Sequence, residues 1–137
     1  MKVVLVFCGV VLVALVVLLV TPLGNDTDLR EKQERAYPVT KKLSQAFIAY
    51  KNEYGTYPDG SYENMLKALQ GDNPRKIIFI AFSPRELNEH GVLVDPWGVF
   101  YHLELPEGKS RPRVWSSGPN RVDESEKGDS DDIVSWR

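Results

Sequence analysis

Hydrophobic residues open this chain in one unbroken run. Residues 3–20 carry no charge and are mostly valine and leucine. As a helix they would extend about 27 Å, enough to cross the hydrocarbon core of a bilayer. The alternative is a cleaved signal peptide, but such an apolar core spans only about 7–15 residues, and residues 21–24 fit a cleavage site poorly. We therefore expect residues 1–24 to be an N-terminal transmembrane helix that remains as a membrane anchor.

Charges on either side of this run predict its orientation. Lys2 precedes it, and Asp26 and Asp28 follow it. By the positive-inside rule the N-terminus stays in the cytoplasm and the rest of the chain lies across the membrane.

A polar segment, residues 25–38, comes next and is expected to form a solvated helical stalk or linker. Pro38 predicts a break or kink there, because proline has no N–H to donate. Beyond it, apolar residues recur at steps of three and four, which predicts an amphipathic helix with one buried face and an end at Gly55. The residues of that face are Val39, Leu43, Ala46, Phe47, Tyr50 and Tyr54.

The remaining pattern predicts short elements separated by turns. Ser61 is placed to cap a short helix that stops at Gly71. We expect a helix over residues 62–70, a buried apolar run over 77–82, a tight turn over 95–98, and strands over 99–105, 113–116 and 133–136. Residues 39–137 thus form one α+β domain, in which the amphipathic helix packs on a small antiparallel sheet.

The C-terminal third concentrates acidic residues in one loop. Residues 120–132 contain six acidic and two basic side chains, between apolar segments that favour burial. A solvated acidic turn is the ordinary interpretation of such a run. The alternative is a hard cation that holds the loop closed, since Ca²⁺ accepts roughly six to eight oxygen ligands in a tolerant geometry. The spacing is not that of an EF-hand.

Three motifs here resemble the major, G-type pseudopilin of bacterial type II secretion systems, a pilin-like family. They are Asp-Pro-Trp-Gly over 95–98 followed by Tyr101, Ser-Gly-Pro-Asn over 117–120 where the family has Leu-Gly-x-Asp, and Gly-Asp-Ser-Asp-Asp-Ile-Val-Ser-Trp over 128–136. The resemblance implies a calcium site in the C-terminal loop. Its implied ligands are Asn120, Asp129, Ser130, Asp132 and a main-chain oxygen near Ser117.

The same resemblance implies a location and partners. The chain would be a single-pass protein of the inner membrane, in contact with its lipid, with a periplasmic C-terminal domain. It would assemble with other pseudopilins and secretion-machine components, including copies of itself, into a short filament. However, the chain has no acidic residue before Asp26 and no Gly-Phe processing site. A membrane-tethered periplasmic binding module that does not polymerise therefore remains the alternative.

Other functional classes lack support in the sequence. The formal net charge is −2, which does not favour nucleic acid as a partner. His90 and His102 belong to no recognisable catalytic motif, and the sequence contains no phosphate-binding glycine loop. A strand histidine such as His102 is more often structural than a catalytic base. We expect the chain not to be an enzyme.

Overall fold

The computed structural model describes residues 24–108, 110–124 and 130–136. The chain divides into two compact units, Met1–Arg30 and Glu31–Arg137, and the fold below is that of the second unit, apart from residues 24–30 at the start of its long helix. Within the described ranges, no helix has the length and apolar character needed to span a bilayer. The anchor predicted over residues 1–24 lies outside these ranges except for Gly24, and its boundary with the stalk stays a prediction.

The longest element is helix α2, Gly24–Tyr54, which continues through Pro38. The predicted break does not occur at this proline, and the alternative, a kink, stays a prediction. Pro38 is exposed, so water can satisfy the carbonyl that loses its N–H partner. Its neighbours Ala36 and Thr40 are fully buried, and the Thr40 hydroxyl donates to the Tyr37 carbonyl at 2.8 Å. Packing on the buried side thus holds the helix together across the proline.

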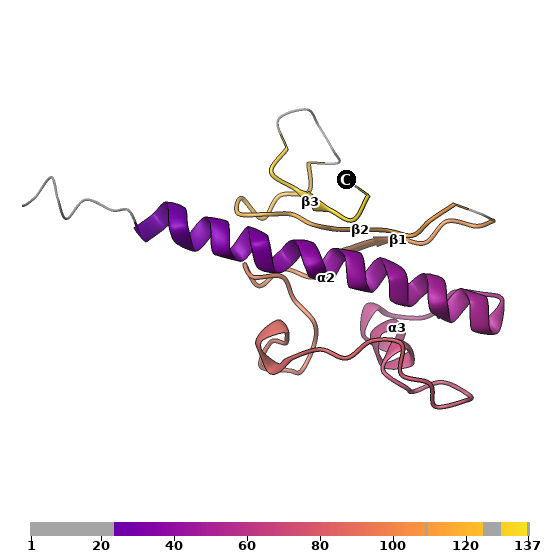
Figure 1. Cartoon of the computed structure of the whole chain (residues 1–137). Helices are drawn as coiled ribbons and strands as arrows, with labels where there is room; N and C mark the ends of the chain where they lie inside the picture. The colour runs from indigo at the N-terminus through magenta and orange to yellow at the C-terminus, as the bar shows by residue number, and fades with distance from the viewer. Residues whose placement is uncertain (1–23, 109, 125–129, 137) are drawn as a thin grey trace, which may run out of the picture. The chain divides into compact units, whose positions relative to one another are not determined.

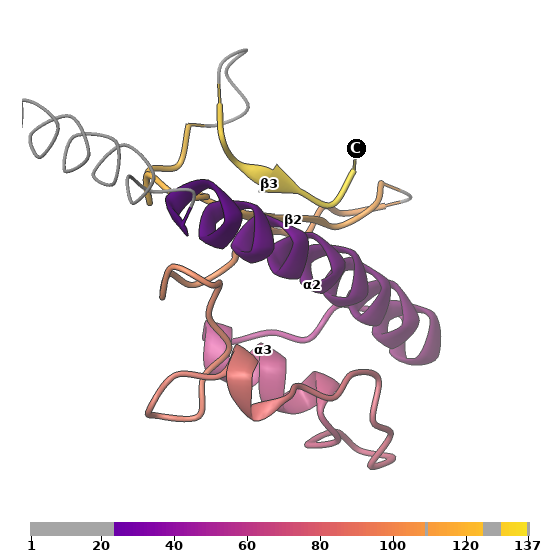
Figure 2. The same ribbon diagram turned by 60° about the vertical axis from the view of Figure 1, so that its left-hand side comes forward.

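The buried face of α2 forms the centre of the core. Val39, Leu43, Ala46 and Phe47 are all at most 6% exposed, as the periodicity predicts. Figures 1 and 2 show the sheet on one side of this helix and α3 on the other. Side chains from α3, β2 and the loops between them complete the core: Leu66, Leu69, Ile80, Leu93, Tyr101 and Val114.

Helix α3, Tyr62–Leu69, forms where the sequence predicts it. The Ser61 hydroxyl accepts a hydrogen bond from the Asn64 N–H at 3.2 Å, and Leu66 and Leu69 are buried. Gly71 follows with a φ of +110°, a conformation that a side chain would disfavour.

The apolar run over residues 77–82 is not a strand. The N–H groups of Phe79 and Ile80 both point to the Leu69 carbonyl, at 2.8 and 3.3 Å, so the segment is tied to the end of α3. Ile80 is 8% exposed, but Ile78 is 67% exposed. The expected burial of the whole run is wrong: the chain bends at Phe79, and of residues 77–82 only Ile80 is buried, while Phe79 and Phe82 are partly buried against the core. A 3-10 helix, η1 (Pro84–Glu86), follows.

Asn73 fixes the loop between α3 and this segment. It is 5% exposed; its amide donates to the carbonyls of Ala68 and Ile77, both at 2.7 Å, and its Oδ1 accepts from the Tyr54 hydroxyl and the Ile77 N–H. We predict that Asn73→Ala lowers the free energy of unfolding by about 2 kcal/mol, because buried polar partners lose their bonds. Urea unfolding would measure it, with the exposed Asn52→Ala as control. Equal losses in the two variants would contradict the prediction.

The sheet contains three antiparallel strands in the order β1-β2-β3. They are β1 (His102–Glu104), β2 (Arg113–Ser116) and β3 (Ile133–Val134). Leu103 pairs with Val114, and Trp115 pairs with Val134. Val114 and Ser116 are buried, whereas Arg113 is exposed on the opposite face. The predicted α+β fold, with a long helix and a small antiparallel sheet, is confirmed.

Candidate metal centre

The turn at Asp95 supports the start of the acidic loop. Asp95 is 3% exposed, and its Oδ1 accepts from the N–H groups of Trp97 at 3.0 Å and Val99 at 2.8 Å. Its Oδ2 accepts from the Ser116 hydroxyl at 2.6 Å. Ser116 Oγ in turn accepts from the Gly118 N–H at 3.1 Å. The Asp-Pro-Trp-Gly turn therefore determines where the chain leaves β2.

The far end of the loop is fastened to β2 as well. Val114 and Ser135 exchange two hydrogen bonds: the Ser135 N–H donates to the Val114 carbonyl at 2.9 Å, and the Val114 N–H donates to the Ser135 hydroxyl at 3.0 Å. Trp136 packs edge-on against Trp115, with ring centroids 6.0 Å apart. The Arg113 guanidinium lies 4.6 Å from the centre of the Trp136 ring. Both ends of the loop are thus held together, as the apolar segments on either side of the acidic run predict.

Gly118 allows the two sides of the loop to touch. Its φ is +64°, and a Cβ at this position would lie 2.4 Å from the Asp131 carbonyl oxygen. Real Cβ atoms essentially never approach an oxygen so closely. The backbone of residues 130–132 therefore depends on a glycine at 118.

Three carboxylates converge where these segments meet. Glu124, Asp131 and Asp132 each offer an oxygen, and these oxygens lie within 4.8 Å of one another. Main-chain N–H groups fix the arrangement: Glu124 Oε2 accepts from Asp131 at 3.1 Å, and Asp132 Oδ2 accepts from Glu124 at 3.2 Å. Beside this cluster, a cavity of about 600 Å³ is lined by α2 residues Gln33, Glu34 and Tyr37 and by residues 130–134.

The electrostatics of the cluster are unfavourable without a cation. Asp131 Oδ1 and Asp132 Oδ1 are buried and have no hydrogen-bond partner among the residues that the structure describes. The pKa of Asp132 is raised, chiefly by desolvation and further by the charges of Asp123 and Glu124, despite bonds from the Glu124 N–H and Ser130. Buried carboxylate oxygens without donors are costly. A hard cation would satisfy both, so the donor set fits Ca²⁺.

A second polar row runs beside this cluster. His102 Nε2 and Ser117 Oγ are hydrogen-bonded at 2.7 Å, and His102 Nδ1 lies 3.8 Å from Asp123 Oδ2. These residue types occur together in serine hydrolases. Here Ser117 is 1% exposed, so its hydroxyl does not reach solvent. The His102 ring stacks on Trp115, whose indole N–H donates to Asp123 at 3.1 Å. The row therefore fastens the first part of the loop to the sheet.

A family model described as type II secretion system (T2SS), protein G, matches residues 26–136. The chain belongs to this family. Searches among curated proteins and among solved structures gave no match. The assignment confirms the pseudopilin resemblance. It supports a role in type II secretion, because members of this family are structural components of the secretion system.

The ligands predicted for this protein G domain have different surroundings in the structure. Asp132 lies in the carboxylate cluster, and Ser130 Oγ accepts from its N–H at 3.0 Å. Asn120 Oδ1 accepts from the Val122 N–H at 2.7 Å, while the Asn120 N–H donates to Asp131 Oδ2 at 3.3 Å. Ser117 is buried beside Gly118 at the end of β2. Asp129 lies outside the described residues.

Glu124 and Asp131 are candidate ligands that the sequence motifs did not single out. The resemblance directed attention to the positions 120, 129, 130 and 132. Asp131 lies within the third motif but was not among the implied ligands, and Glu124 was visible only as a member of the acidic run. Their approach depends on the loop closing on itself at Gly118. The calcium site and its ligand set remain predictions.

Proposed function

We propose that the chain is a pseudopilin of a type II secretion system that takes part in protein export by joining other pseudopilins in a short filament. The family match over residues 26–136 carries this proposal, because it covers nearly all of the predicted stalk and domain. In this proposal residues 1–24 anchor the chain in the inner membrane, with a cytoplasmic N-terminus and a periplasmic domain.

Calcium is the cofactor that the acidic loop would hold. Glu124, Asp131 and Asp132 support this part of the proposal, since their oxygens lie together. Within the described ranges, Asp131 Oδ1 and Asp132 Oδ1 have no donor. Asn120, Asp129, Ser130 and the main chain near Ser117 would complete a shell of six to eight oxygens. When bound, the cation would neutralise the loop and keep its two fastened ends together. Its role would therefore be structural.

The test of filament assembly uses cross-linking within the predicted anchor. Cys8 is the only cysteine, so a Cys8→Ser background allows single cysteines to be placed in turn over residues 3–20. We expect oxidation in native membranes to give disulfide-linked species, with the chain itself or with other pseudopilins carrying matched cysteines, along one face of this segment. The Cys8→Ser chain is the control.

The tethered-module alternative predicts a different outcome. If no position over residues 3–20 cross-links to any pseudopilin, while the chain is still present in the membrane, the filament role is wrong. One feature of the sequence favours the alternative: the chain has no acidic residue before Asp26. An acidic side chain in lipid is costly unless it is paired, so a chain that anchors alone is expected to lack one there.

A further inference from the structure

A second cavity, of about 320 Å³, lies between α2 and the loop that carries η1. We call it the basic groove. Part of its lining is apolar: Pro38, Val39, Val94, Pro96 and Tyr101. Its size is at the lower end of the range for ligand pockets in proteins, about 300–1,000 Å³. All of its lining residues lie in the Glu31–Arg137 unit and none belongs to the acidic loop.

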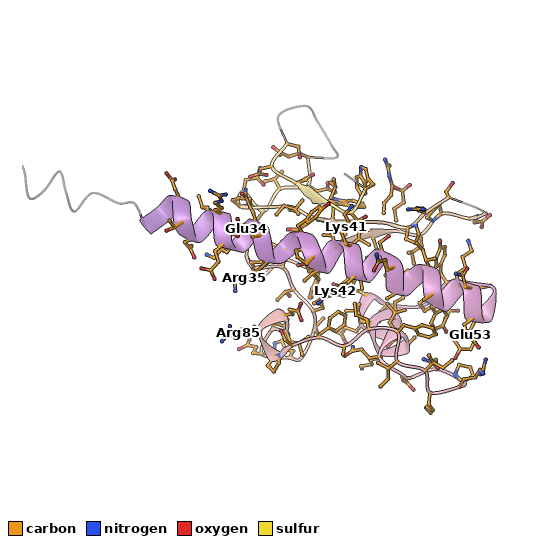
Figure 3. The ribbon with its side chains drawn as sticks, viewed as in Figure 1. Glu34, Arg35, Lys41, Lys42, Glu53 and Arg85 are labelled. Carbon is orange, nitrogen blue, oxygen red and sulfur yellow. The ribbon has the colours of Figure 1, made fainter. Side chains whose placement is uncertain are left out.

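Three cationic side chains line the same groove: Arg35 and Lys42 from α2, and Arg85 from η1. Figure 3 shows Arg35 and Lys42 on the side of α2 that faces Arg85. Within the described part of the chain, neither Lys42 nor Arg85 forms an ion pair, and Arg35 has only a helical neighbour, with Nε 3.9 Å from the Glu31 carboxylate. The lining therefore holds three cations and two carboxylates, Glu34 and Glu86, and it keeps a small excess of positive charge.

The other charges decide which kind of ligand fits. Glu34 and Glu86 also line the groove. The Glu86 carboxylate already has a partner within its own turn, because its Oε2 accepts a hydrogen bond from the Ser83 N–H at 2.6 Å. A compact phosphate dianion would meet these carboxylates and would leave the apolar lining uncovered. A short peptide suits the mixture better, since its carboxylates can reach the three cations while an apolar side chain covers Pro38 and Pro96.

We propose that the basic groove binds a short segment of a partner protein in which acidic side chains flank an apolar one. Its carboxylates pair with Arg35, Lys42 and Arg85, and its apolar side chain packs on the lining. Charge complementarity and cavity size carry this assignment. Calcium and filament assembly are not required for it, so it can fail while the proposed function holds, and the reverse.

The test measures binding of a defined probe to the full chain in a non-ionic detergent, with chelator present. The probe is a fluorescein-labelled peptide of sequence Asp-Leu-Asp-Asp-Leu-Asp, followed by fluorescence anisotropy. We expect saturable binding that weakens as salt screens the charges. Arg85→Glu should lower the affinity at least about tenfold, and Arg85→Lys should retain most of it. The charge-matched control is Arg111→Glu, an exposed arginine that lines a different cavity.

Control peptides separate the two parts of the recognition. Replacing leucine by serine in the probe should weaken binding, and replacing aspartate by lysine should abolish it. The proposal is overturned if Arg85→Glu binds the probe as well as the native chain does, or if the lysine peptide binds equally. It is also overturned if the chain self-associates without peptide and Arg85→Glu alone prevents this, because the occupant would then be a second copy.

Discussion

Calcium should raise the melting temperature of the native chain by roughly 10 °C above its value in chelator. A cation that binds only the folded state at about 100 times its dissociation constant stabilises it by about 2.7 kcal/mol. For a domain of this size, each kcal/mol corresponds to several degrees. The physical reason is local: in the described part of the loop, Asp131 Oδ1 and Asp132 Oδ1 are buried without donors, in a cluster of three carboxylates. Circular dichroism of the detergent-solubilised chain would measure the shift.

Asp132→Asn should lower the melting temperature when calcium is present but not when chelator is present. With calcium, the variant should melt below the native chain, because it lacks a charged ligand and binds the cation at least about tenfold more weakly. In chelator it should melt at the same temperature as the native chain or higher, because it removes a buried like charge. Asp59→Asn, at an exposed turn position, is the matched control and should change neither value. A native melting point unaffected by calcium would contradict the site.

The pH dependence in chelator follows from the raised pKa of Asp132. A carboxyl whose pKa is higher in the folded state than in the unfolded state destabilises the fold when it ionises. This cost is complete above the folded pKa and disappears as the pH falls to the unfolded pKa. The advantage of Asp132→Asn in chelator should therefore shrink on acidification through this interval. An advantage that grows on acidification would contradict the assignment.

Local sequence rules predicted most of the elements in this fold. The spacing of Val39, Leu43 and Phe47 predicted the buried face of α2, and Ser61 predicted the start of α3. The break predicted at Pro38 does not occur because the local cost of the proline is outweighed by burial on both sides of it in the sequence, at Ala36 and Thr40. A propensity argument includes that cost but cannot include the tertiary packing that opposes it.

The site was less predictable than the fold for a related reason. Sequence showed that oxygen ligands crowd the C-terminal loop, but it could not show which of them meet. Pairing of the ends through Val114 and Ser135, and the close approach at Gly118, bring Glu124 to Asp131 and Asp132. Motif spacing gives only how far apart residues lie along the chain. It does not show that the loop folds back and brings Glu124 to Asp131 and Asp132. The groove between α2 and η1 was invisible for the same reason.

Gly118→Ala should destabilise the chain by about 3 kcal/mol and weaken calcium binding in the same variant. The backbone cost of a φ of +64° is about 1–2 kcal/mol for a residue with a Cβ. A further cost of about 1–3 kcal/mol arises because the new Cβ would lie 2.4 Å from the Asp131 carbonyl oxygen, which is backbone and must shift. That shift would carry Asp131 and Asp132 away from Glu124. Urea unfolding and calcium titration would measure the two effects.

Gly91→Ala separates the backbone strain from the displacement of the loop. Gly91 has a similar φ of +73°, but a Cβ there would meet nothing within 4 Å. This variant should therefore lose only about 1–2 kcal/mol and bind calcium as the native chain does. If both variants lose the same stability and keep the same calcium affinity, the contact between Gly118 and Asp131 does not position the carboxylates. If Gly118→Ala alone loses calcium, closure of the loop at this glycine is what assembles the site.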